Sequence, residues 1–153
     1  MEECAFAVAS AIEEASSFIM QLPLSQLRLM DDSRFPWVLL VPSREELAEW
    51  SDLHPAELQQ LAREIRWATR LVEQWAHPHK VNVASLGNVV RQMHVHVVGR
   101  ETTDIAWPGA VWGCGKAIPY SAEEKSALQH QLSSAMLSIW QEETANEGDE
   151  QSI

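Results

Sequence analysis

The sequence has little of several features that define whole classes of proteins. Its 2 cysteines, Cys4 and Cys114, are too few for a disulfide framework and lack the spacing of metal ligands. No apolar run approaches the roughly 20 residues of a membrane span, and the apolar stretch over residues 5–12 is flanked by glutamates rather than by a basic segment. We therefore predict a cytoplasmic protein with reduced thiols, no signal peptide and no membrane contact.

Basic residues are also scarce. The chain has 11 lysines and arginines against 22 aspartates and glutamates, which gives a net charge of −11. The surplus of acid lies mostly at the two ends, and residues 31–125 are close to neutral. Because duplex nucleic acid binds to a basic face, we do not expect it as a partner. A small anionic substrate, which needs only a few local donors, is compatible with this balance.

The rest of the composition is that of one soluble domain. The chain has 153 residues, of which 46% are hydrophobic, and this is enough for a single core. We expect one domain over residues 1–142, in which residues 1–22 form an N-terminal helical extension. The polar and acidic end, residues 143–153, is typical of a disordered tail.

Apolar periodicity and turn residues divide the domain into strands and helices. Apolar residues at steps of three and four predict a long helix that begins at Pro55 and ends before Pro78. His54 and Glu57 have the spacing of a capping box at its start. Together the elements predict an α+β fold, an antiparallel sheet with the long helix and a C-terminal helix packed largely on one face. The other expected elements are strands over 24–30, 37–41 and 80–86, a strand ending at Arg100, a short helix from Pro42 to about Trp50, and a helix after Ser121.

The stretch GNVVRQMHVHVVGR, residues 87–100, has the pattern of an apolar strand with an unusual polar row. Because strand side chains alternate between faces, Gln92, His94 and His96 share one face and the apolar residues between them share the other. Three interpretations fit this row. The histidines can be ordinary polar residues of an exposed face, they can chelate a metal with the nearby pair in residues 77–79, or they can catalyse phosphoryl transfer.

Imidazole chemistry is suited to the third interpretation. A neutral imidazole is a nucleophile, and with a reference pKa of about 6.5 most of it is neutral at pH 7. A second imidazole beside it can protonate or stabilise the leaving oxygen. Gly87 and Asn88 can offer backbone and carboxamide donors to phosphate oxygens. Such a site needs no metal, and neither histidine pair has a carboxylate or thiolate at ligand spacing.

The same stretch resembles the active-site strand of the histidine triad (HIT) superfamily of nucleotide hydrolases and transferases, His-φ-His-φ-His-φφ with φ apolar. The match runs from Met93 to Val98. The resemblance extends beyond this motif and covers residues 24–112. The preceding strand of the family is similar to KVNVASLGN, the first hairpin is similar to LRLMDDSRFPWVLLVP, and a downstream element is similar to WPG. Gln92 stands where the first histidine is expected, as in a bacterial branch with Gln-φ-His-φ-His. Trp37 stands where many members have a histidine.

The resemblance implies a catalytic role for three residues and a set of binding residues. His94 is the nucleophile that attacks the α-phosphorus of a nucleotide, for example a dinucleoside polyphosphate, and forms a covalent nucleotidyl-histidine. His96 contacts the phosphate and the leaving oxygen, and Gln92 supports them. A homodimer formed through the long helix and an edge strand is also implied, with no cofactor and no metal. The alternatives are a nucleotide-binding protein with little turnover and a metal-dependent hydrolase. The expected substrate-binding residues are Asn82, Gly87, Asn88, Asp31 and Trp107.

Overall fold

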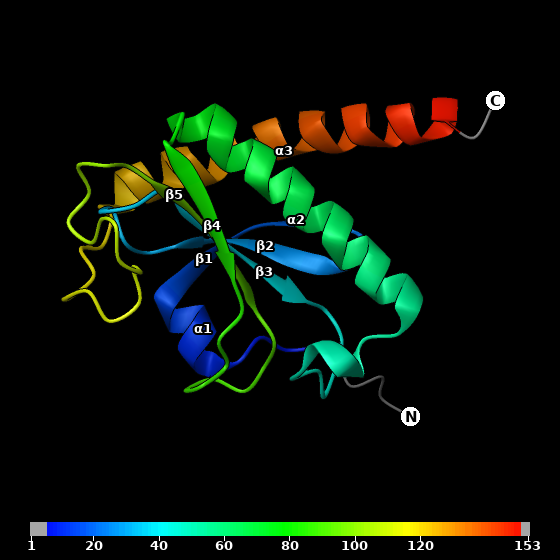
Figure 1. Cartoon of the computed structure of the whole chain (residues 1–153), viewed down its shortest axis with the longest axis horizontal. Helices are drawn as coiled ribbons and strands as arrows, with labels where there is room; N and C mark the ends of the chain where they lie inside the picture. Colours follow the sequence, from blue (N-terminus) through cyan, green and yellow to red (C-terminus); the bar gives the residue numbers. More distant parts are fainter. Residues whose placement is uncertain (1–5, 151–153) are drawn as a thin grey trace.

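The structure, a computed structural model, describes residues 6–150 of the chain (Figure 1). Its elements are α1 (Ser10–Ala15), β1 (Ser16–Gln21), β2 (Ser25–Met30), β3 (Trp37–Pro42), the 3-10 helix η1 (Trp50–Asp52), α2 (Pro55–Ala76), β4 (Lys80–Ala84), β5 (Val95–Arg100) and α3 (Ala122–Glu150). The strands form one antiparallel sheet in the order β1-β2-β3-β5-β4. α2 lies across one face of this sheet with α3 beside it (Figure 1), which confirms the predicted α+β fold. No helix within residues 6–150 has the length and apolar content needed to cross a membrane.

The main core lies between the sheet and the two long helices. Leu27 faces Leu40 and Leu29 faces Val38 across the β2–β3 ladder, so that these side chains share the helix-facing side. They are buried against α2 and α3. Each fully buried aliphatic side chain of this kind contributes about 1.5–3 kcal/mol. The alternation of the strands therefore holds the sheet on the helices and leaves the other face for the candidate site.

α2 has the ends that its sequence predicts. Pro55 is its first residue, and the carboxylate of Glu57 accepts the backbone N–H of His54 at 2.7 Å. The helix closes at His77, whose left-handed backbone (φ 46°) lets its N–H bond back to the last turn. Pro78 follows and prevents the helix from continuing.

The opposite face of the sheet is also covered. Every residue of β3 and β5 is buried. The interpretation of His96 as an ordinary polar residue of an exposed face was therefore wrong, because the N-terminal segment (residues 6–15) and the loop 101–121 fold over this face. The buried residues of this second cluster are Ile12, Phe35, Trp37, Leu39, Val41, Val98 and Val111, and Phe6, Val8, Ala9 and Trp112 pack against it.

Two local predictions in the first third of the chain were wrong. The expected helix over residues 1–22 covers only Ser10–Ala15, and Ser16–Gln21 forms β1; residues 1–5 lie outside the described part. β1 pairs with β2, and this pairing satisfies backbone groups that a continued helix would leave unpaired on β2. The short helix expected up to about Trp50 is a turn region, and η1 begins only at Trp50.

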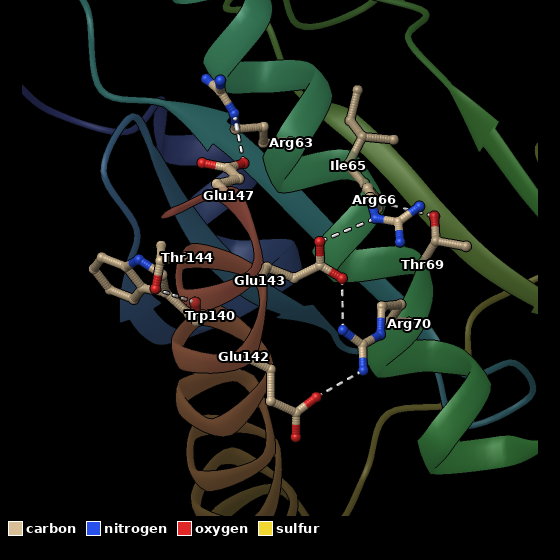
Figure 2. Close-up of polar contacts among 10 residues, drawn as sticks. All are labelled: Arg63, Ile65, Arg66, Thr69, Arg70, Trp140, Glu142, Glu143, Thr144 and Glu147. Carbon is tan, nitrogen blue, oxygen red and sulfur yellow. Dashed lines mark hydrogen bonds and ion pairs between the residues drawn. The ribbon is translucent and has the colours of Figure 1, made fainter. Parts of the chain in front are cut away.

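The acidic C-terminus is helical over much of the expected tail. α3 continues to Glu150, so residues 143–150 do not form the disordered segment that we predicted, and residues 151–153 lie outside the described part. Arginines of α2 form ion pairs with three of the acidic side chains of α3 (Figure 2), which offsets part of the repulsion that made disorder the expected state. The ion pairs are Arg63–Glu147, Arg66–Glu143, Arg70–Glu142 and Arg70–Glu143.

Candidate active site

Two histidines lie side by side where β5 begins. His94 directly precedes β5 and His96 is its second residue. Their ring centroids are 5.0 Å apart and the ring planes are inclined by 65°. His94 is partly exposed, whereas His96 is only 5% exposed. The alternation read from the sequence thus brings the two rings together, one at the surface and one beneath it.

The main chain sets the protonation of His94. Its Nδ1 lies 2.7 Å from the carbonyl oxygen of Gln92. A carbonyl oxygen can only accept a hydrogen bond, so the ring donates through Nδ1–H. In the neutral ring the lone pair is then on Nε2. His94 therefore has the unprotonated nitrogen that a nucleophile requires.

Trp37 sets the opposite tautomer of His96. The indole Nε1–H of Trp37 donates to Nδ1 of His96 at 3.1 Å. Because an indole nitrogen is only a donor, Nδ1 of His96 accepts with its lone pair, and the proton of the neutral ring is on Nε2. Burial, and next the neighbouring His94, lower the pKa of His96 to about 3. His96 is therefore neutral at pH 7 and offers a single N–H donor at Nε2.

A second indole completes the surroundings of His96. The ring centroid of Trp112 lies 5.3 Å from that of His96 and 6.1 Å from that of Trp37. Trp112 belongs to the loop 101–121, and sequence reasoning did not select it. The signal was present in the apolar run WPGAVW, which is unusual for a loop that faces solvent. His96 is thus held between two tryptophans, one from a strand and one from this loop.

The side chain of Gln92 binds the N-terminal segment instead of the histidines. Its Oε1 accepts the backbone N–H of Ala9 at 2.7 Å, and its Nε2 donates to the backbone carbonyl of Ala7 at 2.9 Å. Among the described residues no hydrogen bond joins this carboxamide to His94 or His96. The predicted polar row is therefore not one hydrogen-bonded network, and Gln92 reaches His94 only through its main-chain carbonyl.

A cavity of about 420 Å³ lies beside the tryptophans that contact His96. Trp37 and Trp112 both line it, whereas the two histidines do not. Its polar lining includes Glu14, Asp31 and Arg34. This volume is within the range of pockets that hold small organic ligands. The two indoles therefore form the wall that separates the cavity from His96.

Two aspartates that directly follow β2 also line this cavity. Asp31, one of the expected substrate-binding residues, accepts hydrogen bonds from the N–H of Tyr120 at 2.9 Å and from the ammonium of Lys125 at 2.8 Å. Asp32 forms an ion pair with Arg34 at 2.8 Å. Burial tends to raise the pKa of Asp32, but the hydrogen bonds from Arg34 and from the backbone N–H of Ile118, with the charge of Arg34, together outweigh it and hold the pKa below its ordinary value. Both carboxylates are thus engaged with the protein, and the substrate-binding role of Asp31 stays a prediction.

The other predicted binding residues fall into two groups, since Asn82 and Trp107 contact Arg100, whereas Gly87 and Asn88 lie between β4 and β5. Asn82 of β4 accepts a hydrogen bond from Arg100 at 2.9 Å, and the ring of Trp107 lies 5.7 Å from the same guanidinium group. Arg100 is only 2% exposed and was not selected from the sequence. Gly87 has the positive φ of a tight turn (71°), and Asn88 beside it is exposed.

The histidine pairs that the metal interpretation combined are apart. His79 packs edge-on against Trp107 and precedes Lys80, which pairs with Arg100 at the opposite end of β5 from His96. Within residues 6–150 no three His, Cys, Asp or Glu side chains are grouped as ligands of one metal ion.

Comparisons with known proteins agree with this geometry. A model of the HIT domain matches residues 11–103, and the chain belongs to the histidine triad family. A histidine triad protein of Bradyrhizobium japonicum is 36% identical, with a TM-score of 0.83 over 86% of this chain and 98% of that one. One of Sinorhizobium meliloti is 37% identical, with a TM-score of 0.82 over 85% and 96%. One of Marinobacter aquaeolei is 30% identical, with a TM-score of 0.84 over 88% and 98%. No curated protein gives a significant match.

Proposed function

We propose that this protein is a nucleotide hydrolase or nucleotidyl transferase that acts at the α-phosphate through a covalent nucleotidyl-histidine. The observation that carries the proposal is the complementary protonation of two adjacent imidazoles. His94 donates through Nδ1 and keeps the lone pair of Nε2, whereas His96 accepts at Nδ1 and keeps a proton on Nε2. A nucleophile beside a fixed hydrogen-bond donor is what displacement at phosphorus requires.

The reaction proceeds in two displacements. Nε2 of His94 attacks the α-phosphorus, the P–N bond forms, and the P–O bond to the leaving group breaks with its electron pair on the leaving oxygen. His96 donates a hydrogen bond from Nε2 to a phosphate or leaving oxygen and stabilises the charge that develops there, without transferring its proton. Water then attacks the same phosphorus, the P–N pair returns to His94, and a proton of the water passes to solvent. An alcohol in place of water gives nucleotidyl transfer.

The cavity beside Trp37 and Trp112 is the proposed site of the nucleoside. Indole rings provide faces on which a base can stack, and Asp31 and Glu14 add carboxylate acceptors for ribose hydroxyls. Gly87 and Asn88 are proposed as donors to the phosphate. A Plasmodium falciparum diadenosine triphosphate hydrolase shares the fold at 14% identity, with a TM-score of 0.63. Its substrate is a phosphoanhydride, in line with the proposed chemistry.

Intact-mass measurement of a trapped intermediate tests the proposal. Wild-type protein mixed with a slowly hydrolysed nucleotide should gain the mass of one nucleotidyl group. His94→Ala should gain none, and His96→Ala should form the adduct about 10² to 10³ times more slowly, the usual cost of removing one hydrogen-bond donor that stabilises the charge of the transition state. A protein that binds nucleotides without forming an adduct is the binding-protein alternative. Loss of activity with a chelator, but not with His94→Ala, would establish the metal-dependent alternative.

The expected homodimer has a suitable surface on the described chain. β4 is an edge strand, and Val83 on it is 45% exposed. Leu86 and Val89 in the loop after it are 41% and 97% exposed. An unpaired strand edge beside apolar side chains favours pairing with a second copy. Light scattering at tens of micromolar should give the mass of a dimer, and a monomer would contradict the proposal.

A further inference from the structure

Gln92 joins the N-terminal segment to the strand that carries the histidines. A carboxamide presents its acceptor and its donor side by side, and here they bind the N–H of Ala9 and the carbonyl of Ala7, two residues apart on one stretch of backbone. An imidazole has its two nitrogens on diverging edges of the ring, so a histidine at this position could not make both bonds. Gln92, the residue that departs from the triad pattern, therefore makes a pair of hydrogen bonds that a histidine could not make.

The main chain of the same residue is bound to the nucleophile. The peptide group between Gln92 and Met93 is held at both of its polar atoms. Its carbonyl accepts from Nδ1 of His94 at 2.7 Å, and its N–H donates to the carbonyl of Leu47 at 2.9 Å. Hydrogen bonds in such a series polarise one another, so the carbonyl becomes a stronger acceptor for His94. Any rotation of this peptide changes the direction and basicity of the His94 ring.

The N-terminal segment is itself anchored on the candidate site. Ile12 is 4% exposed in the second apolar cluster, and Phe6 and Val8 pack against the same cluster, which includes Trp37. The segment continues into the cavity wall, where Glu14 is one of the lining residues. The segment is thus fixed by apolar contacts of its own, and the carboxamide of Gln92 is its polar link to the strand of the histidines.

We propose that the backbone of Ala7 and Ala9 in the N-terminal segment positions the nucleophile, because by holding the side chain of Gln92 it fixes the peptide group that orients His94. Gln92 is then a positioning residue that acts through its own carbonyl. The inference rests on the proposed nucleophilic role of His94. A purely structural role for Gln92 gives a different expectation, namely lower stability with an unchanged His94 tautomer and an unchanged rate per folded molecule.

A substitution in the segment, distant in sequence from the histidines, separates the two roles. Ala9→Pro removes the N–H that Gln92 accepts, while the native φ of Ala9, −56°, is close to the value that proline requires. Ser10→Pro is the matched control. Ser10 is the first residue of α1, where proline is favoured, and Ala9 already has the extended backbone that a residue before proline adopts. Gln92→Met keeps the length of the side chain and removes both hydrogen bonds.

Two measurements are made on these proteins: the rate of nucleotidyl adduct formation and the ¹⁵N chemical shifts of His94 in the resting protein. Ala9→Pro and Gln92→Met should each slow adduct formation about 10²-fold, the effect of misplacing a reacting group by about 1 Å. The double variant should be no slower than either single one, because both break the same link. Both variants should also reduce the Nδ1-protonated population of His94, and Ser10→Pro should change nothing.

The outcomes distinguish this inference from the proposed function. A wild-type protein that forms no adduct would reject the function, and the resting ¹⁵N shifts would still report whether Ala9 and Gln92 set the tautomer of His94. Near-normal rates in Ala9→Pro, or additive losses in the double variant, would overturn the positioning role. If Ala9→Pro does not fold, Gln92→Met with an unchanged His94 tautomer would overturn it in the same way.

Discussion

The protonation of His96 predicts which leaving groups the protein can expel. Trp37 places an N–H against Nδ1 of His96, so a second proton on this ring would set two donors facing each other. The neighbouring His94 also opposes the protonation of His96. His96 can therefore donate a hydrogen bond but cannot act as a general acid. Leaving groups that depart as stable anions, such as the phosphate of an anhydride, need no acid. An amine that leaves from a phosphoramidate does need a general acid, because it must be protonated as it departs.

The size of the discrimination follows from the pKa of His96. With a pKa of about 3, about one molecule in 10⁴ carries the imidazolium at pH 7, and forming it costs roughly 5 kcal/mol. General acid assistance is usually worth about 10²- to 10⁴-fold in rate. A phosphoramidate should therefore form the His94 adduct about 10² to 10⁴ times more slowly than an anhydride of the same nucleoside. Lowering the pH from 8 to 5.5 should not close this gap.

Single-turnover adduct formation with the two substrates is the assay, because it isolates the step in which the leaving group departs. Trp37→Gln is the informative variant, because the side-chain carbonyl oxygen of glutamine can accept a hydrogen bond from a protonated Nδ1 of His96. The variant therefore permits the imidazolium form of His96. In that variant the gap should narrow as the pH falls. Equal wild-type rates for the two substrates, or a gap that closes below pH 7, would refute the reasoning. NMR titration of His96 between pH 5 and 8 should show no change.

Three further predictions concern stability. Burial raises the pKa of Glu64, so its ionisation destabilises the fold as the pH rises above about 4.5. Glu64→Gln, which can still accept a hydrogen bond from the N–H of Leu24, should therefore unfold at a higher urea concentration than wild type at pH 7. At pH 4 the two proteins should unfold at the same urea concentration. The pKa of His96 is lower in the folded protein than in the unfolded chain, so the unfolded chain binds the proton more readily. Stability should therefore fall as the pH drops from about 6.5 toward 3. Calorimetry should find this pH dependence absent in His96→Gln. Arg70→Ala removes the ion pairs to Glu142 and Glu143 and should cost about 0.5–1 kcal/mol in denaturant titrations, with a smaller loss in about 1 M salt.

The period of the apolar residues was sufficient to bring the two histidines together. Met93, Val95 and Val97 alternate with His94 and His96, and alternate residues share a face in any strand, whatever covers that face. The capping box of α2 was equally predictable, because its signal is local: His54 and Glu57 interact three residues apart.

The cover of the candidate site could not be predicted in this way. The position of Trp112 depends on the loop 101–121, which Asp31 and Asp32 hold through contacts nearly 90 residues away in sequence. Such contacts leave no period in the sequence. The carboxamide contacts of Gln92 are of the same kind, since Ala7 and Ala9 carry no side-chain signal. The resemblance to the family could locate the departure at Gln92 but not the partner that it binds.

Burial of β3 and β5 on both faces has a consequence for motion. Backbone amides of central strands that are covered on both sides exchange with solvent only when most of a domain opens, whereas loops exchange through small local openings. His96 is set within such a strand, in register with Leu39 of β3, and so belongs to the part of the molecule that should open last. His94 lies one residue outside it, at the border with the loop that carries Gly87 and Asn88. Substrate can therefore rearrange the approach to the nucleophile on a fast timescale while its donor partner stays in place.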